Sequence, residues 1–407
     1  MSEFLPRAYR RGALPSRPLR RHSRIYAVLV PGIVLVLSAF LIGCTGNDEN
    51  RNARSGDRNR PEGTDRAVRS ATVPVLRVAE QHGLAYAPLV LIRSAGEDRT
   101  GETGGTGDTG EDGGVTTAGE NGGSGDTRNS AELQIEWIRV NNAAAVREAM
   151  LANRLDVGFM GIPPYLIGRD TATGWRAFTG LSRAPLGLVT IDSRIPDLET
   201  LAAPGAPFRI ALPQPGSIQH ILLAIALDRR FGDPTRLDHR LVSLGHPDGM
   251  NAMLSGGGDI SAHFTSPPFL FEELRRPEAT LLLSGEDAFG GEFTFIIGVL
   301  RPGLSHETPA VLAFQRRLQE AVDEITRLQD ELRDSGENGD GGSLPRSSMR
   351  TLNLLADAYE IDAEVLRRDL MEEGMVYEDA IRGMERFRDR MHAFGYISGE
   401  TGTGVVE

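Results

Sequence analysis

Two separate stretches of this chain repeat one order of residues. The first copy, "AMLANRLDVGFMGIPPY", covers 149–165, and the second copy, "AMLSGGGDISAHFTSPPF", covers 252–269. Each copy places four residues between Ala-Met-Leu and an Asp, followed by an apolar run, Pro-Pro and an aromatic residue. Since Pro fixes φ and needs no backbone donor in a first helical turn, the order predicts a helix, a buried strand and a new helix.

The predicted strands have a consequence for ligand binding. The carboxyl end of each strand and the first N–H groups of the following helix must face the same point. In open α/β sheets, ligands bind outside the carboxyl ends of the strands. Two copies therefore predict two α/β lobes that grip a small ligand from both sides of a cleft.

Strand and helix patterns alternate along most of the remaining chain. Strand-like segments such as "TVPVLRVAE" (72–80) and "LQIEWIRV" (133–140) are each followed by helical patterns, the second of them with Asn141 as its expected cap. The alternation predicts an α/β fold with largely parallel sheets. A long amphipathic helix is predicted over 307–332, and helical patterns continue over 349–394.

Composition limits the class of protein. The chain has 407 residues, of which 40% are hydrophobic and 25% charged, so it can form two domains of ordinary size with real cores. Its formal net charge is -12. Residues 1–24 hold seven Arg and one Glu, which leaves 37 basic and 55 acidic residues elsewhere, a net of -18. Such a surface disfavours nucleic acid as a partner, because nucleic-acid binding depends on neutralising phosphates.

The N-terminus has the order of an export signal. Seven Arg precede the uncharged apolar run "IYAVLVPGIVLVLSAFLIG" (25–43), which ends at Cys44. "LIGC" resembles the bacterial lipobox, which implies cleavage before Cys44, lipidation of its thiol and attachment to a membrane face. An uncleaved N-terminal anchor helix is the alternative interpretation.

Three polar, glycine-rich stretches cannot bury enough apolar surface to fold alone. We interpret 45–72 as a disordered tether, 96–130 as a disordered surface insertion and 334–348 as a loop insertion.

Catalytic and metal-binding signatures are missing from the sequence. Cys44 is the one cysteine, so the chain can form neither an internal disulfide nor a cysteine-ligated metal cluster. The sequence contains no G-x-S-x-G, H-E-x-x-H or P-loop motif. We therefore expect no catalytic residues, no metal and no cofactor.

Four strings, taken in order, resemble one family. They are "GLAYAPL" (83–89), "NNAAAVREAMLANRLDVGFMGIPP", "QPGSIQHILLAIALDR" and "MLSGGGDISAHFTSPP". They are similar to the nitrate/sulfonate/taurine-type substrate-binding proteins of ABC transporters, a group that includes binders of thiamine-pyrimidine precursors. The resemblance implies the type II-like periplasmic-binding-protein fold, in which two Rossmann-like lobes close on a ligand about a hinge, followed here by a helical C-terminal region.

The resemblance also implies domain boundaries. They are a signal peptide with lipobox at 1–44, the tether 45–72, lobe 1 at 73–183, lobe 2 at 184–287, a return to lobe 1 with C-terminal helices at 288–398 and a tail at 399–407.

Carried over residue by residue, the family's ligand contacts fall on loops. The implied ligand-binding residues are Tyr86, Ala87, Gly161, Ile162, Ser217, Ile218, Gln219, His263, Thr265 and Ser266. Simpler interpretations stay open: Ser217 is a good N-cap, Tyr86 could pack between lobes, and His263 could be a hydrogen-bonded core residue.

The expected function is capture of a small polar or anionic solute, such as nitrate, a sulfonate, taurine or a pyrimidine, and its delivery to an ABC permease. The protein would be exported, lipid-anchored and monomeric. One alternative is a sensory or scaffold lipoprotein of the same fold. Another is an enzyme like the pyrimidine-precursor synthases, which the missing cysteine-rich motif disfavours.

Overall fold

The computed structural model describes residues 74–101, 133–171, 174–256, 259–337, 344–372, 374–398 and 404. All of them belong to one compact unit, Arg69–Glu407. The predicted signal segment with Cys44, the tether and nearly all of the tail lie outside the described residues. Of the described helices, none is long and apolar enough to cross a membrane.

The first sheet has five strands in the order β2-β1-β3-β10-β4. Their bounds are β1 Val75–Glu80, β2 Gln134–Arg139, β3 Val157–Gly161, β4 Arg176–Ser182 and β10 Ile296–Leu300. β1 pairs parallel with β2 and β3, whereas β10 runs antiparallel to both β3 and β4. Every residue of β3 and β10 is buried, which is expected of strands in the middle of a sheet covered on both faces.

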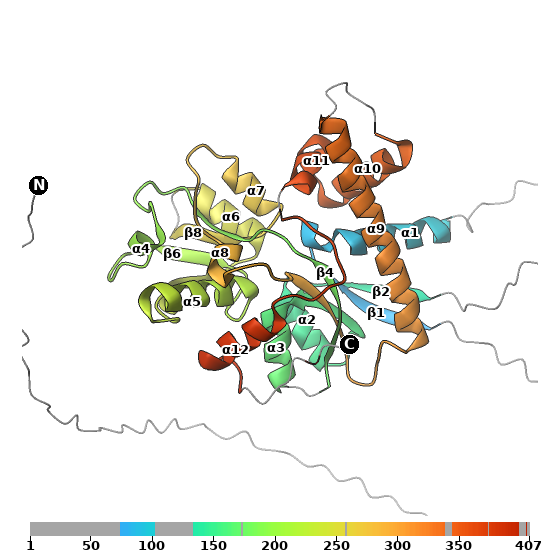
Figure 1. Cartoon of the computed structure of the whole chain (residues 1–407), viewed down its shortest axis with the longest axis horizontal. Coiled ribbons are helices and arrows are strands. Elements are labelled where there is room, and N and C mark those ends of the chain that lie inside the picture. The colour runs from blue at the N-terminus through green and yellow to red at the C-terminus, as the bar shows by residue number, and fades with distance from the viewer. Residues whose placement is uncertain are drawn as a thin grey trace, which may run out of the picture. The chain divides into compact units, whose positions relative to one another are not determined.

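The second sheet has five strands in the order β7-β6-β8-β5-β9. Their bounds are β5 Gly187–Thr190, β6 Arg209–Leu212, β7 Leu241–Ser243, β8 Ile260–Thr265 and β9 Thr280–Ser284. β6 pairs parallel with β7 and β8, and β5 pairs antiparallel with β8 and β9. Figure 1 shows this sheet with α5, α6 and α7 around it, beside the first sheet with α1, α2 and α3.

The two sheets have the same topology, which explains the repeated segment. In each sheet the chain builds three parallel strands linked by helices, and the third of these, β3 or β8, is the central strand. The two copies occupy these equivalent positions, each running from a helix through the central strand into the next helix. The α/β fold with two lobes is thus confirmed.

Largely parallel sheets were expected, and four of the five strands in each sheet do run in one direction. Each sheet contains one strand, β10 or β5, that runs against its neighbours. Both strands follow a segment that has just crossed from the other sheet, so the chain enters from the opposite end. A strand that arrives in this way needs no helical crossover and pairs antiparallel.

Helices cover both sheets, and most begin directly after a strand. Their bounds are η1 Leu84–Tyr86, α1 Ala87–Gly101, α2 Ala143–Leu151, α3 Ile162–Thr171, α4 Leu198–Leu201, α5 Ile218–Phe231, η3 Asp238–Arg240, α6 His246–Leu254, α7 Phe269–Leu274, α8 Gly285–Phe289, α9 Pro309–Glu337, α10 Arg346–Tyr359, α11 Ala363–Met371 and α12 Met384–Ala393. Asn142, and not Asn141, caps α2, because its side chain accepts a hydrogen bond from the N–H of Ala145 at 3.0 Å.

Two predicted loop insertions are shorter than the sequence suggested. α1 continues through 96–101, and α9 and α10 take the two ends of the stretch 334–348. Once a packed segment has formed a helix, each further residue adds one hydrogen bond at little cost, so polar residues can extend it. The remainder of the two insertions, 102–130 and 338–343, lies outside the described residues.

The C-terminal helices hold the loop that follows β1. α9 packs against α1, and α10 packs against both of them. The hydroxyl of Tyr359 donates to the carbonyl of Gly83 at 3.0 Å, and that of Tyr377 donates to the carbonyl of Leu84 at 2.8 Å. Both hydroxyls are buried, so these two hydrogen bonds hold the loop after β1 in place.

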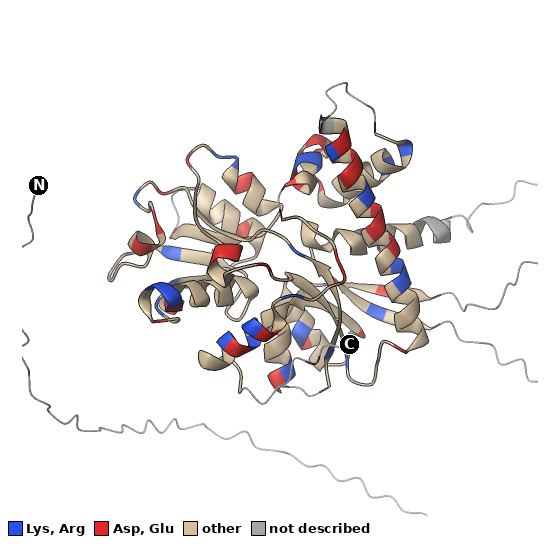
Figure 2. Cartoon of the chain, viewed as in Figure 1, with Lys and Arg blue, Asp and Glu red and all other residues tan. Residues whose placement is uncertain are grey.

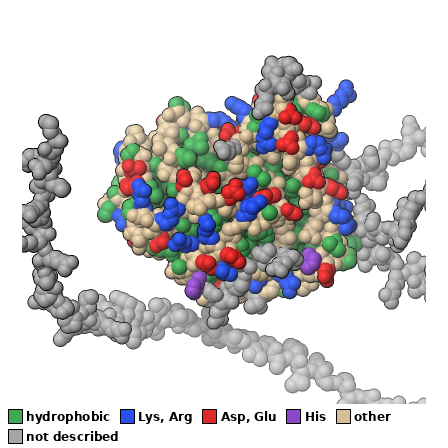
Figure 3. Space-filling model, in the orientation of Figure 1, with side chains coloured by type: hydrophobic (Ala, Val, Ile, Leu, Met, Phe, Trp, Pro, Cys, Tyr) green, Lys and Arg blue, Asp and Glu red, His purple; other side chains and the backbone are tan. Residues whose placement is uncertain are grey.

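Charged residues lie mainly on the outer helices. Figure 2 shows both signs along α9 and α12 and very few on the strands. The face seen in Figure 3 carries acidic and basic side chains interspersed with apolar ones. On that face, charges of both signs lie near one another.

Candidate functional site

A single small cavity collects residues from six strand-to-helix junctions. Its volume is about 80 Å³, more than one water molecule needs and less than the ~300–1,000 Å³ of sites for drug-sized ligands. Three junctions, after β1, β2 and β3, belong to the first sheet, and three, after β6, β7 and β8, belong to the second. The lining residues are Gln81, His82, Gly83, Ala85, Tyr86, Asn141, Asn142, Ala143, Gly161, Pro164, Pro213, Gln214, Ser217, Ile218, Gln219, Gly245, His246, Ser266, Pro267, Phe295 and Ile296.

The electrostatics of this cavity favour a negative or strongly polar guest. Among the described lining residues there is no Asp, Glu, Lys or Arg. The lining includes the N-terminal ends of α2, α5 and α6, where free N–H groups and the helix dipole provide partial positive charge. Anions bind at such ends without a basic side chain.

The entry to α5 is held in a defined geometry. The Ser217 hydroxyl accepts a hydrogen bond from the N–H of His220 at 3.3 Å, which makes Ser217 the N-cap. His220 Nδ1 in turn accepts from the N–H of Gly216 at 2.9 Å, and its Nε2 lies 3.2 Å from a carboxylate oxygen of Asp238. Gly216 has φ +80, and a Cβ there would lie 2.8 Å from Ile167, so glycine is required.

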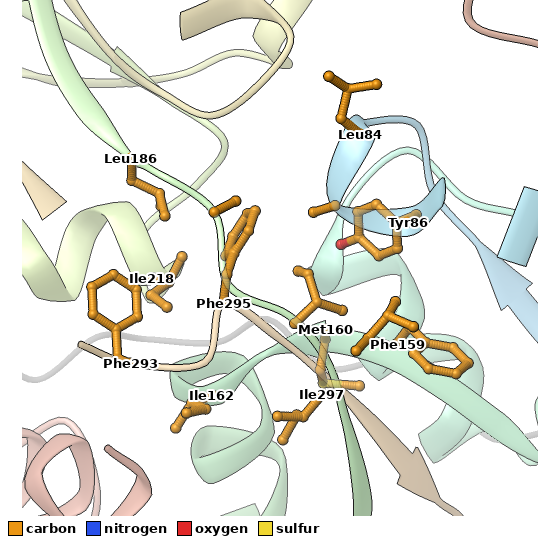
Figure 4. Close-up of a cluster of buried hydrophobic side chains, with 14 of the residues drawn as sticks. Leu84, Tyr86, Phe159, Met160, Ile162, Leu186, Ile218, Phe293, Phe295 and Ile297 are labelled. Carbon is orange, nitrogen blue, oxygen red and sulfur yellow. The ribbon is translucent and has the colours of Figure 1, made fainter. Parts of the chain in front are cut away.

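The two sheets approach closely beside the cavity. A Cβ placed on Gly161, at the end of β3, would lie 3.4 Å from the Cβ of Ile218 on α5 and 3.5 Å from the carbonyl oxygen of Phe295. Figure 4 shows Phe295 on the crossing segment between Ile218 and Tyr86, all three of which line the cavity. A methyl group therefore fits here at ordinary contact distance, whereas a larger side chain at position 161 would press against Ile218.

Beneath the cavity, three ionisable side chains of the second sheet form a hydrogen-bonded chain. Glu273 Oε1 lies 2.5 Å from His263 Nδ1, and His263 Nε2 lies 3.3 Å from His246 Nδ1. His246 Nε2 then lies 3.3 Å from both the Ser266 hydroxyl and the Gln219 amide nitrogen. Glu273 and His263 are fully buried, whereas His246 lines the cavity.

Burial sets the charge of this chain. Burial, with a smaller contribution from Glu272, raises the pKa of Glu273 to about 9. Burial lowers the pKa of His263, and burial together with the neighbouring His263 lowers that of His246. At neutral pH all three groups are therefore uncharged, with Glu273 protonated.

The structure separates the predicted ligand-binding residues into two groups. Tyr86, Gly161, Ser217, Ile218, Gln219 and Ser266 line the cavity. Ala87, Ile162, His263 and Thr265 are fully buried behind it. Ala87 and Ile162 face the core because each is the first residue of a packed helix, α1 or α3. Whether any of the six contacts a ligand stays a prediction.

Sequence reasoning missed several polar residues of the cavity. His82 and His246 lie outside the four family-like strings, Gln214 begins one of them but was not singled out, and Glu273 belongs to a helix whose polar side would ordinarily face water. The sequence pattern around His246 could have indicated a site residue, because His246 follows the short strand β7 and begins α6. The ring centroids of His82 and His246 lie 6.3 and 5.8 Å from that of Phe269.

No group of three or more His, Cys, Asp or Glu among the described residues could hold a metal ion. Neither a protein-family model nor a curated protein sequence matches the chain. Solved structures do match over most of its length, at low sequence identity.

Three such structures have TM-scores above 0.5. The zinc-bound ligand-binding component of an ABC-type import system from Staphylococcus aureus is 12% identical, with a TM-score of 0.56, covering 82% of this chain and 96% of that one. The alkanesulfonate-binding protein SsuA from Xanthomonas axonopodis pv. citri, bound to MOPS, is 16% identical, with a TM-score of 0.54 and coverage of 82% and 98%. The CA3427 gene product of Candida albicans, described as having the generic periplasmic binding protein fold, is 11% identical, with a TM-score of 0.54 and coverage of 82% and 96%.

These likenesses confirm the expected fold, that of the periplasmic binding proteins. At these identities they establish the fold alone, and the ligand must be argued from the cavity itself.

Proposed function

We propose that the protein is the solute-binding component of an ABC importer and that its ligand is a small oxyanion such as nitrate or a short sulfonate. The observation that carries the proposal is the convergence of six strand-to-helix junctions, three from each sheet, on a cavity with no charged lining residue among those described. Helix N-termini supply the attraction for an anion. The two-lobed fold supplies the hinge, and the small cavity limits ligand size.

The structural neighbours support this proposal. One is an import-system component and another binds alkanesulfonates, so a solute-binding role is the common use of the fold among them. A sensory or scaffold lipoprotein would have the same cavity, and an adjacent permease gene would distinguish transport from that role. We further propose that Cys44 carries the lipid anchor.

A thermal-shift screen tests the ligand class. Nitrate, bicarbonate, methanesulfonate and taurine are compared with the neutral acetamide and a neutral pyrimidine, with metal chelator present throughout. A ligand at a hundred times its dissociation constant stabilises the folded state by about 2.7 kcal/mol, a readily measured shift. Stabilisation by the neutral compounds alone would contradict the anion proposal.

A charge introduced into the cavity gives a second test. Gln219 is buried and lines the cavity, so Gln219→Glu places a carboxylate beside the bound anion with little change in shape. Two like charges about 4 Å apart repel by several kcal/mol at an effective dielectric constant near 20, so affinity should fall at least ten-fold. Gln319→Glu on the exposed face of α9 makes the same chemical change far from the cavity and should leave affinity unchanged.

A further inference from the structure

With both rings uncharged, the contacts within the buried chain allow two arrangements of protons, and the Thr265 hydroxyl, 3.2 Å from His246 Nδ1, can rotate to fit either of them. The contact between Glu273 Oε1 and His263 Nδ1 needs one hydrogen, and so does the contact between His263 Nε2 and His246 Nδ1. If Glu273 is protonated, each ring carries its hydrogen on Nε2, His246 offers an N–H donor to the cavity, and the Gln219 amide must turn its oxygen toward that donor. If Glu273 is ionised, both rings carry it on Nδ1 and His246 Nε2 becomes an acceptor.

The two arrangements differ by one proton. When the ionised chain takes up a proton at His246 Nε2, the Nδ1 proton of His246 passes to His263 Nε2, and the Nδ1 proton of His263 passes to Glu273 Oε1. Three transfers therefore move one net charge from the cavity wall to a carboxyl group with no solvent exposure. Only the protonated chain offers a hydrogen-bond donor to an anion.

We propose that the Glu273–His263–His246 chain is a proton relay and that the cavity binds its oxyanion together with this one proton. The ligand class is a small singly charged oxyanion whose oxygen accepts from His246 Nε2. This inference rests on the proposed function, because it assumes an anion in the cavity.

Packing around the chain supports the relay. Glu273 Oε2 has no hydrogen-bond partner among the described residues, an arrangement that is far less costly for a neutral carboxyl group than for a carboxylate. A Cβ on Gly249 would lie 2.7 Å from His263 Nε2, so a glycine there lets α6 approach the ring closely enough for His246 to reach it. Burial also raises the pKa of Glu273, in the direction that keeps the relay protonated at neutral pH.

No basic side chain faces the relay among the described residues. The strands beside β8 place Val189 and Ala211 in register with His263. The polar, titratable or charged groups near the relay from other positions are the hydroxyls of Thr265 and Ser266, Gln219 of α5, exposed Asp248 of α6, exposed Glu272 of α7 and His82 beside Phe269.

The order Ser266, His246, His263 and Glu273 also resembles a serine nucleophile with its base. The residue that follows Ser266 is Pro267, and then Pro268, so neither has the N–H that would stabilise an oxyanion beside the nucleophile. The chain is therefore suited to holding an anion and a proton, and we expect no hydrolysis of p-nitrophenyl acetate above the level of a Ser266→Ala variant.

Nitrogen NMR of the histidine rings tests the relay without a ligand. In the wild-type protein at pH 7, His246 and His263 should both carry hydrogen on Nε2, and both should change to Nδ1 in one joint step at alkaline pH. Glu273→Gln should abolish the step. Rings in different tautomers, an imidazolium at pH 7, or a joint step that persists in Glu273→Gln would overturn the relay, and the wild-type measurement alone suffices if the variant fails to fold.

Calorimetry with nitrate and methanesulfonate tests the coupling, because both probes keep one negative charge across the whole pH range. Wild-type affinity should be constant near neutral pH and fall about ten-fold per pH unit once the relay loses its proton. Glu272→Gln, which removes the adjacent exposed carboxylate, should keep that slope, whereas Glu273→Gln should bind with pH-independent affinity. An anion that binds wild type with pH-independent affinity would refute the coupling only. If NMR shows the expected joint change of tautomer and neither anion binds, the proposed function is wrong, and the proposed coupling between anion and proton binding is wrong as well.

Discussion

The two copies of the repeated segment supply a matched pair of mutations. Asp156 ends the first copy's helix-to-strand turn, and its carboxylate receives hydrogen bonds from Arg77 at 2.9 and 3.0 Å and from Arg301 at 2.6 Å. Asp259 is the equivalent residue of the second copy, with one contact to Arg209 at 3.3 Å. The Asp156 side chain is 8% exposed and the Asp259 side chain is 83% exposed.

The pKa of Asp156 gives the size of the effect. Burial alone would raise this pKa, but the hydrogen bonds from Arg77 and Arg301 outweigh it and lower the pKa from 3.8 to about 2. One pH unit corresponds to about 1.4 kcal/mol, so Asp156→Asn should destabilise the folded state by roughly 2 kcal/mol at neutral pH. Asp259→Asn should cost about 0–0.5 kcal/mol, as for an exposed ion pair.

The sign of the pH dependence is also determined. Because the pKa is lowered in the folded state, the stabilisation by Asp156 is present in full above the ordinary pKa of 3.8 and is lost as pH falls toward 2. Urea unfolding at pH 7 and pH 3 measures both variants against wild type. Equal effects of the two substitutions at pH 7, or an Asp156→Asn effect that does not shrink with acid, would refute the reasoning.

Four further predictions follow from the site and the targeting segment. Ser217→Ala removes the N-cap of α5 and should lower the free energy of unfolding by about 1 kcal/mol, measured by urea unfolding, while Ser217→Thr should not. Gly161→Leu should press against Ile218 and weaken anion binding at least ten-fold in calorimetry. Gly161→Ala, with a Cβ 3.4 Å from Ile218, should keep an affinity close to that of wild type. Equal affinities of the two variants would place the ligand elsewhere. Because the pKa of Glu273 is raised in the folded state, wild-type stability should fall by about 1 kcal/mol per pH unit from pH 7 to pH 9, above the range in which the histidines contribute, and a Glu273→Gln variant with the same slope would contradict this. Finally, wild type expressed in a bacterium should fractionate with membranes and Cys44→Ser should remain unprocessed; a full-length, soluble wild-type chain would exclude lipidation.

The sequence determined the architecture because the relevant signals are local. Pro-Pro after an apolar run is a local signal for the junction between a strand and a helix, and the two copies of this order predicted two lobes with the carboxyl ends of their strands available. Gly161, Ser217 and Ser266 were predicted near the site through the family resemblance of the strings that contain them, and all three line the cavity.

Tertiary structure alone decided strand direction and the chemistry of the cavity. β5 and β10 run antiparallel because the chain enters each sheet from the other lobe, which no local pattern encodes. The Glu273–His263–His246 chain joins α7, β8 and the start of α6, and its contacts depend on how these elements pack. An isolated Glu on a short helix would be solvated and charged. Only its burial against His263 makes it a proton-holding group, because the cost of a buried charge is a property of the folded environment and not of the residue.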